Sequence, residues 1–247
     1  MNNKYLSLVS FQRGLLIALW GLLSLSVTHH VHSQNQARSI KLTNSSIGYL
    51  EHVPEGYDQS SARYPVMIFL HGIGERGNGT SDLHKVKKNG PPKYVEQGHD
   101  MSFDANGKKE SFIVISPQLR ADYNSWPAFY VDHVVEHVRK NYRIDEDRIY
   151  LVGLSLGGGG CWRYASEKPE YANKIAAIAP ACGAQAYQSD KVGNLVNANV
   201  KVWAFHGDAD PVVPVRHSKD WTSNINQLSP GLADLTIYPG GGHGAAW

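Results

Sequence analysis

The sequence predicts an α/β fold of three layers: a mostly parallel central sheet with helices covering both of its faces. Short apolar runs rich in β-branched residues recur between turn residues, and segments with helical periodicity lie between several of them. Some runs, such as residues 65–70, are apolar without alternation, which is typical of strands buried on both faces. Because strands that alternate with helices pair in parallel, these patterns together favour the layered architecture.

We expect seven strands, in chain order, over residues 47–53, 65–70, 112–116, 148–152, 174–179, 200–205 and 235–238. Residues 34–39 are polar and predict no regular element. Residues 74–111 are the least regular segment and are rich in Gly, Lys and Arg. They predict a long excursion between two strands with a short helix, the kind of segment that often carries a binding surface.

Three helices are expected between these strands. Valines at positions 131, 134, 135 and 138 follow the i, i+3, i+4, i+7 spacing, and charged residues occupy the opposite side. A second helix should follow Ser155 and end before Pro169. A weaker third helix is expected over about residues 216–227.

The charge balance argues against a nucleic-acid partner. The 247 residues hold 24 Lys and Arg against 22 Asp and Glu. Residues 1–33 contain two of the basic residues and none of the acidic ones, so the remainder holds 22 of each. Nucleic-acid binding usually needs a basic stripe. A hydrophobic share of 42% also excludes a disordered chain.

Residues 1–33 have the pattern of a secretory signal peptide. Lys4 and Arg13 precede an apolar run over residues 14–27, which is shorter than the roughly 20 residues that a membrane span needs. A small residue, Ser33, stands where cleavage is expected. The sequence therefore predicts export, to the periplasm or the medium, with residues 34–247 as the mature chain and no stable membrane span after cleavage. An uncleaved signal anchor is the alternative.

Residues 153–157, Gly-Leu-Ser-Leu-Gly, match the pattern G-x-S-x-G in an informative setting. A predicted buried strand leads into the pattern, and a predicted helix that begins with four glycines, residues 157–160, follows it. Such a sharp turn holds the serine in a strained backbone conformation and needs small neighbours. We therefore predict Ser155 as a nucleophile. A phosphate-binding loop is disfavoured because its usual glycine patterns are missing in this frame.

A serine hydroxyl needs a general base, and the base needs an orienting acid. Asp210 follows the sixth predicted strand, at the sheet edge where parallel sheets place their sites, and is the predicted acid. Asp208, in the same loop, is predicted to be a turn residue. His243 follows the last predicted strand and is the predicted base, because His206 comes too early and His217 falls on a predicted helix.

Hydrolysis of an acyl compound builds negative charge on the carbonyl oxygen, and each preorganised N–H donor at that oxygen is worth roughly 10²–10³ in rate. The N–H of Leu156, directly after the nucleophile, is one expected donor. The N–H of Ile73, in the loop after the strand over residues 65–70, is the other. His71 is expected to brace that loop rather than to react.

The segments 70–77, 147–158, 206–214 and 240–247 resemble motifs of the α/β-hydrolase superfamily. They are most similar to its small single-domain esterases, namely the phospholipase/carboxylesterase, dienelactone-hydrolase-like, and secreted feruloyl and acetylxylan esterase groups. The heptapeptide at 71–77 is similar to a branch labelled predicted peptidases. The resemblance covers about residues 47–247 and implies an α/β-hydrolase catalytic domain with a Ser155–His243–Asp210 triad and an oxyanion hole from Ile73 and Leu156.

The sequence departs from these relatives at its end. Family members usually continue past the catalytic histidine into a final helix, whereas this sequence stops four residues after His243. Chain ends fray unless they are held. We therefore expect either that residues 245–247 dock firmly with Trp247 as the anchor, or that the sequence is a truncated form.

Several points stay open at this stage. Cys161 and Cys182 could form a disulfide after export or remain two buried thiols. The aromatic residues at positions 123, 126, 129 and 130 could fill the core or offer a platform to a sugar or phenolic group. No pattern predicts a metal site, and serine chemistry needs no cofactor.

The sequence therefore predicts an exported serine esterase that forms an acyl-enzyme. Expected substrates are small soluble esters, or acyl and feruloyl groups on polysaccharide. One alternative is a serine peptidase of the same fold, which would be limited to small peptides because the chain leaves no room for a gating domain. The other alternative is a non-catalytic binding protein on the same scaffold.

Overall fold

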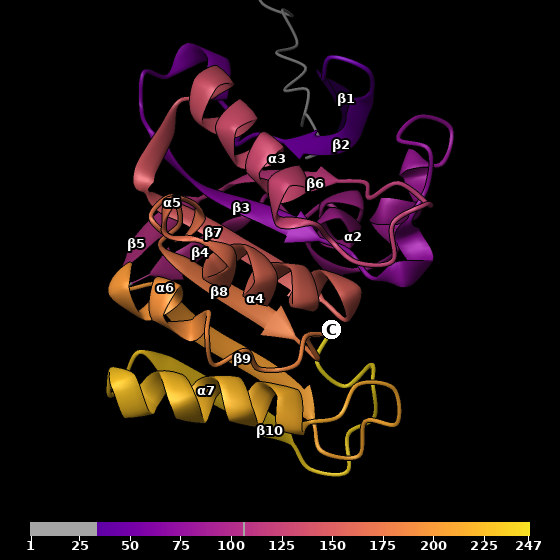
Figure 1. The fold of residues 1–247 in the computed structure, drawn as a ribbon. Helices are drawn as coiled ribbons and strands as arrows, with labels where there is room; N and C mark the ends of the chain where they lie inside the picture. Colours follow the sequence, from indigo (N-terminus) through magenta and orange to yellow (C-terminus); the bar gives the residue numbers. More distant parts are fainter. Residues whose placement is uncertain (1–33, 106) are drawn as a thin grey trace, which may run out of the picture. The chain divides into compact units, whose positions relative to one another are not determined.

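The computed structural model describes residues 34–105 and 107–247, and an eight-stranded sheet runs through them (Figure 1). The strand order is β1-β2-β6-β3-β7-β8-β9-β10. Only β2 runs against its neighbours, so the predicted mostly parallel sheet is confirmed. The bounds are β1 Gln36–Lys41, β2 Ser46–His52, β3 Tyr64–Leu70, β6 Ile113–Pro117, β7 Ile144–Leu154, β8 Ala177–Ala181, β9 Lys201–Gly207 and β10 Ala233–Tyr238. The predicted signal peptide lies outside the described residues.

Helices cover both faces of the sheet, which gives the three predicted layers. On one face lie α3 (Ala128–Asn141), α4 (Leu156–Glu167), α5 (Pro169–Ala172), α6 (Val192–Asn197) and α7 (Arg216–Leu228) (Figure 1). Fully buried strand residues such as Ile68 and Leu151 belong to the main core beneath them. On the other face, Val95 of α2 (Gly90–Glu96) packs against Val114 and Met67.

The order of the strands reverses at the carboxyl ends of β3 and β7. From β3 the chain first goes to β6 on one side of it and then returns to β7 on the other side. Ligands of open α/β sheets bind where the strand order reverses in this way, because the connections on either side leave in opposite directions. The loops after β3 and β7 therefore meet at this point.

Two expectations need correction. Residues 36–41 form β1, although the polar sequence of 34–39 predicts no element. Only Ile40 of this edge strand is buried, so backbone pairing with β2, and not an apolar face, holds it. The irregular segment 74–111 contains more structure than one short helix: η2 (Ile73–Glu75), η3 (Leu83–Lys88), α2, and a hairpin of β4 (Ser102–Ala105) with β5 (Lys108–Ser111). A further short helix, η1, covers Tyr57–Gln59.

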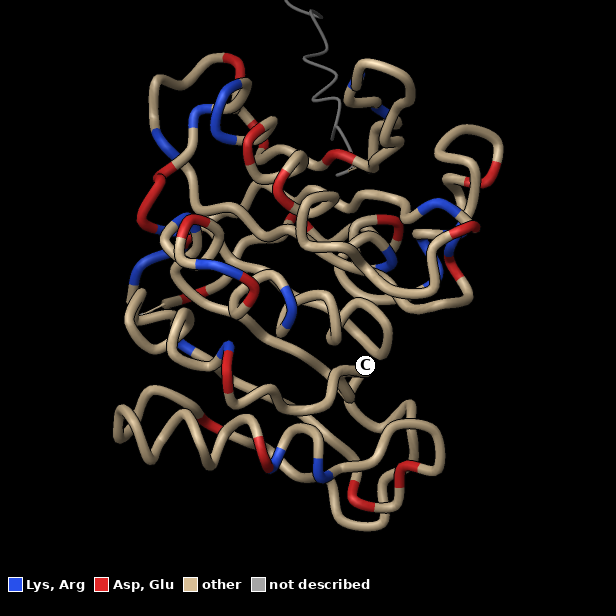
Figure 2. Tube along the Cα trace, viewed as in Figure 1, with Lys and Arg blue, Asp and Glu red and all other residues tan. Residues whose placement is uncertain are grey.

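The structure also settles points that the sequence leaves open. Cys161 and Cys182 are buried free thiols. Trp126 and Tyr130 are core residues that contact each other edge to face, whereas half of Phe129 is exposed. Lys and Arg are interspersed with Asp and Glu over the chain (Figure 2). Among the described residues, no helix has the length and apolar composition to cross a membrane.

The helix α4 lies unusually close to the end of β3, and this closeness depends on glycine. A Cβ atom at Gly157 would stand 1.8 Å from the carbonyl oxygen of Leu70. We therefore expect Gly157→Ala to lower the free energy of unfolding in urea by about 3 kcal/mol or more. Gly193→Ala in α6 is the matched control, because a Cβ there would meet no other element within 4 Å. Equal stability of the two variants would contradict this packing.

Candidate active site

Ser155 occupies the sharp turn between β7 and α4 that the sequence predicts. Its backbone has φ 51° and ψ −115°, a region that non-glycine residues rarely adopt. The surrounding backbone holds it there: the N–H of Ser155 donates to Ala181 O at 2.8 Å, and its carbonyl accepts from Gly159 and Ala184. Strain of this kind persists only where neighbouring structure fixes it, and it concentrates at functional sites.

The three residues predicted to react together form a continuous chain of hydrogen bonds. The Nε2 atom of His243 lies 2.9 Å from Ser155 Oγ, and its Nδ1 atom lies 2.8 Å from Asp210 Oδ2. Because a carboxylate can only accept, Nδ1 carries the proton and Nε2 accepts from the serine hydroxyl. The base side of the imidazole therefore faces the hydroxyl that it would deprotonate.

Asp210 is a fully buried carboxylate held by backbone donors. Its Oδ1 atom accepts from the N–H groups of Val212 and Val213 at 2.8 and 2.9 Å. Burial acts to raise the pKa of Asp210, but the hydrogen bonds from His243, Val213 and Val212 outweigh it and hold that pKa below its usual range. The carboxylate is therefore ionised at neutral pH and can stabilise a charged imidazole.

Asp208 lies in the turn directly after β9, as predicted, but its carboxylate bonds outside that turn. Its Oδ1 atom accepts from the N–H of Gly240 at 2.6 Å, in the loop that carries His243. The N–H of Ala209 donates to Gly241 O across the same gap. These bonds join the loop after β9 to the loop after β10, and so they fix the acid relative to the base.

The last three residues contact the site. Ala246 packs against the small cluster of Phe69, Leu154 and Ala181. The indole of Trp247 meets the imidazole of His243 edge to face, with ring centroids 4.8 Å apart. These contacts match the expected docking of residues 245–247, with Trp247 against the base.

The loop after β3 carries the other predicted group. Ile73 begins η2 and Leu156 begins α4, and the first N–H groups of a helix have no acceptor within it. The two loops are in contact: a Cβ atom at Gly72 would lie 3.8 Å from Ser155 Cβ. The structure therefore places the loop that carries Ile73 beside the turn that carries Ser155, and Ile73 is 55% exposed.

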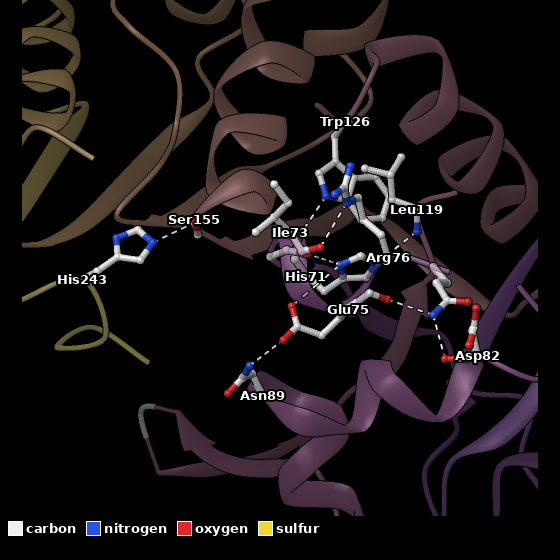
Figure 3. A network of polar contacts seen from close by, with 12 residues as sticks. His71, Ile73, Glu75, Arg76, Asp82, Asn89, Leu119, Trp126, Ser155 and His243 are labelled. Carbon is white, nitrogen blue, oxygen red and sulfur yellow. Dashed lines mark hydrogen bonds and ion pairs between the residues drawn. The ribbon is translucent and has the colours of Figure 1, made fainter. Parts of the chain in front are cut away.

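His71 braces this loop, as predicted (Figure 3). Its Nδ1 atom lies 2.6 Å from Gly72 O, its Nε2 atom accepts from the N–H of Leu119, and the indole N–H of Trp126 donates to its carbonyl at 3.0 Å. Burial lowers the pKa of His71 to about 4. The imidazole is thus neutral, with its proton on Nδ1.

Sequence reasoning missed the clamp formed by Arg76. Its guanidinium donates to the carbonyl of Ile73, within the loop (Figure 3), and to those of Ala121 and Tyr123, in the segment after β6. No local pattern could reveal these partners, because they lie 45 and 47 residues away. An arginine guanidinium carries five N–H donors in a rigid, planar arrangement, so it can bond several carbonyl oxygens at once.

Folding also assembles a cluster that the sequence leaves scattered. Within the described residues, Cys182, His206 and Asp210 are the one group of three potential metal-ligating side chains, with their ligand atoms within 4.8 Å of one another. His206 Nε2 lies 3.3 Å from Asp210 Oδ2. The spacing i, i+4 between His206 and Asp210 is the only local signal of this contact.

Ser155 lies on a strained strand-to-helix turn and is hydrogen bonded to His243, which is in turn hydrogen bonded to Asp210. This arrangement, with the histidine and the aspartate in two later loops of a mostly parallel sheet, defines an α/β-hydrolase. Residues 57–246 match the family model described as Phospholipase/Carboxylesterase, so the chain belongs to that family.

Curated relatives carry esterase names. The chain is 26% identical over 184 residues to a bifunctional acetylxylan esterase/xylanase of Neocallimastix patriciarum, covering 71% of this chain and 24% of the relative. It is 25% identical over 217 residues to feruloyl esterase D of Neurospora crassa, covering 84% and 68%. The chain thus spans about a quarter of the first relative and about two thirds of the second.

Solved structures agree on the fold. A crystal structure of a thermostable esterase superposes with a TM-score of 0.62 at 28% identity, covering 83% of this chain and 55% of that one. A feruloyl esterase module of Clostridium thermocellum, complexed with sinapinate, superposes with a TM-score of 0.64 at 18% identity, covering 86% and 82%. At such low identity the second likeness shows the fold alone.

The buried neutral His71 makes stability depend on pH. Its pKa is about 4 when folded against an ordinary 6.5, so the unfolded chain takes up the proton first as pH falls. Stability should fall between about pH 6.5 and 4, with a loss on the order of 2–3 kcal/mol by pH 4.5. We expect urea unfolding at pH 7 and pH 4.5 to show a larger loss for the wild type than for His71→Gln. The two proteins share every other histidine. Equal losses of unfolding free energy between pH 7 and pH 4.5 would therefore show that burial of His71 does not cause the pH dependence.

Proposed function

We propose that this protein is an exported serine esterase that hydrolyses carboxylic esters through an acyl-enzyme. The observation that carries the proposal is the unbroken hydrogen-bond chain from Ser155 through His243 to Asp210. The hydroxyl of Ser155 donates to the unprotonated Nε2 of His243, and the Nδ1–H of His243 donates to Asp210. This is the direction that nucleophilic catalysis needs.

In this mechanism Ser155 Oγ attacks the ester carbonyl while His243 Nε2 takes the hydroxyl proton. Asp210 stabilises the imidazolium that forms and keeps its Nδ1–H directed away from the serine. The proton passes to the departing alcohol, and the acyl group stays on Ser155. Water, deprotonated by the same histidine, then releases the acid and restores the serine.

The N–H groups of Ile73 and Leu156 would bind the oxygen on which charge develops. Leu156 begins the 12-residue helix α4, where the partial positive charge of the backbone also favours an anion. The Arg76 clamp and the His71 brace hold the Ile73 loop in place, so its donor does not have to be ordered during the reaction.

Exposed apolar side chains around the triad support an ester carried on a large molecule. Ile73 is 55% exposed and Val212, beside Asp210, is 64% exposed. Trp247 is partly exposed where it meets His243. A surface site with apolar edges admits an acyl group from a polymer without requiring the polymer to enter an enclosed cavity.

The relatives support the particular substrate class. Two carry the names acetylxylan esterase and feruloyl esterase, which favours acyl or feruloyl esters on polysaccharide. Export is supported by the pattern of residues 1–33, in which basic residues precede a short apolar run. A polymeric substrate outside the cell would require such export.

A panel of substrates tests the proposal. Wild type and Ser155→Ala should be compared on a short-chain nitrophenyl ester, methyl ferulate, acetylated xylan and a peptide nitroanilide. We expect the wild type to hydrolyse the esters far faster than the anilide, and Ser155→Ala to lose at least about 10³-fold in kcat because the nucleophile is gone. The ratio of kcat/KM values then identifies the acyl group.

The same panel contains the contradicting results. Faster cleavage of the anilide than of any ester would identify a peptidase. Soluble, folded wild type that turns over nothing would favour a binding protein on this scaffold. Full ester turnover by Ser155→Ala would show that the nucleophile is another residue.

A further inference from the structure

The carboxylate of Asp210 is enclosed by two side chains that the proposed reaction does not use. Cys182 follows β8 and His206 lies in β9, and both are fully buried. Their sulfur and nitrogen atoms and a carboxylate oxygen of Asp210 lie within 4.8 Å of one another. On the opposite side, the same carboxylate contacts His243.

The proton positions on His206 follow from its neighbours. Its Nε2 atom lies 3.0 Å from Val213 O and 3.3 Å from Asp210 Oδ2, and both of these atoms can only accept. Nε2 therefore carries a proton, which it donates to Val213 O with Asp210 Oδ2 close beside it. The Nδ1 atom lies 2.8 Å from the hydroxyl of Ser218 in α7, which can donate to it.

Val213 links His206 to the acid. Its N–H donates to Asp210 Oδ1, and its carbonyl accepts from His206, whose Nε2 atom lies 3.3 Å from Oδ2. Oδ1 is thus hydrogen bonded to Val213, and Oδ2 lies against His206. Rotation of the carboxylate away from His243 would break bonds at both oxygens.

Cys182 approaches the carboxylate from β8. Its backbone has φ 44°, a strained value for a residue with a side chain, and its N–H donates to Phe205 O at 2.8 Å. Burial, with a contribution from the charge of Asp210, raises the pKa of the Cys182 thiol to about 11. The thiol therefore stays protonated at neutral pH, and its S–H group is available as a donor beside the carboxylate.

We propose that His206 and Cys182 are positioning residues that hold Asp210 ionised and aimed at His243, an inference that rests on the proposed function. A buried carboxylate without enough donors is costly, and it would either take up a proton or turn toward solvent. The buried N–H group of His206 and S–H group of Cys182 beside the carboxylate oppose both outcomes, while Oδ2 is hydrogen bonded to the imidazole of His243.

The charged and titratable groups around this unit are few. Asp210 is faced by His243 from the loop after β10, by His206 from β9 and by Cys182 from the end of β8. Behind His206, the imidazole of His217 in α7 interacts electrostatically with it. A change at His206 therefore reaches His243 mainly through Asp210.

Paired substitutions test the proposal in the full-length protein. His206→Leu removes the donor, and His206→Gln keeps an N–H near the place of Nε2. Cys182→Ala and Cys182→Ser form the second pair. His52→Gln is the control: it also removes a buried histidine, but from β2, which four strands separate from β9. Thermal unfolding followed by circular dichroism verifies that each variant folds.

We expect His206→Leu to lower kcat about tenfold with KM nearly unchanged, because a misaligned acid slows proton transfer without touching substrate binding. The acid limb of its pH–rate profile should move down by about half a pH unit, since an acid that is protonated or turned away leaves less negative charge beside His243. His206→Gln should recover most of kcat. Cys182→Ala should act in the same direction but more weakly, and Cys182→Ser and His52→Gln should resemble the wild type.

A readout that needs no turnover separates this inference from the proposed function. Nitrogen-15 NMR of the histidines gives the pH midpoint at which His243 takes up a proton, with His243→Gln assigning the signal. A lower midpoint in His206→Leu supports the positioning role even if the wild type hydrolyses none of the esters. If folded His206→Leu matches the wild type in both midpoint and kcat, or if Leu and Gln behave alike, the positioning role is wrong.

Discussion

The arrangement of this site depends on one close approach, where the backbone of α4 meets the ends of β3 and β8. Gly157 allows α4 to begin against the carbonyl of Leu70, and Ser155 is tied to Ala181 of β8 by a 2.8 Å hydrogen bond. Between these contacts the chain must turn so sharply that Ser155 adopts a positive φ. The strain at the serine and the glycines after it are thus two consequences of a single packing constraint.

Parallel strands explain how distant residues meet at this turn. Ser155 and His243 are separated by 88 residues, and Asp210 and His243 by 33, yet each follows a strand whose carboxyl end lies on the same edge of the sheet. The strands alone do not fix the positions of the loops that carry these residues. Asp208 and the backbone of Ala209 and Gly241 fix them by joining the loops after β9 and β10, which lie at the lower right of Figure 1. These bonds hold the two loops in a fixed relative position, so the hydrogen bond between Asp210 and His243 is maintained.

Much of this arrangement is visible in the sequence, and the parts that are not share a physical reason. Buried strands such as β3 can be recognised from their continuous apolar runs. The turn at Ser155 can be recognised from the glycines around it. The edge strand β1 carries no such signal, because its stability comes from backbone pairing with β2. The clamp of Arg76 and the contacts of Asp208 and His206 are tertiary, and a polar residue in a loop does not reveal which distant carbonyl or carboxylate it will meet. The predicted positions of Ser155, Asp210 and His243 could be inferred because the fold fixes their order along the chain, whereas their supporting residues could not.

The most direct measurement is covalent labelling of the protein with a fluorophosphonate, followed by mass spectrometry of its peptides. An activated serine attacks the phosphorus and keeps the label, whereas an ordinary serine hydroxyl does not react at a comparable rate. The triad geometry predicts one label per chain, on Ser155, formed at least about 10²-fold more slowly in His243→Gln because the general base is missing. A folded wild-type protein that takes up no label, or that takes it up on another residue, would contradict the assignment of Ser155 as the nucleophile.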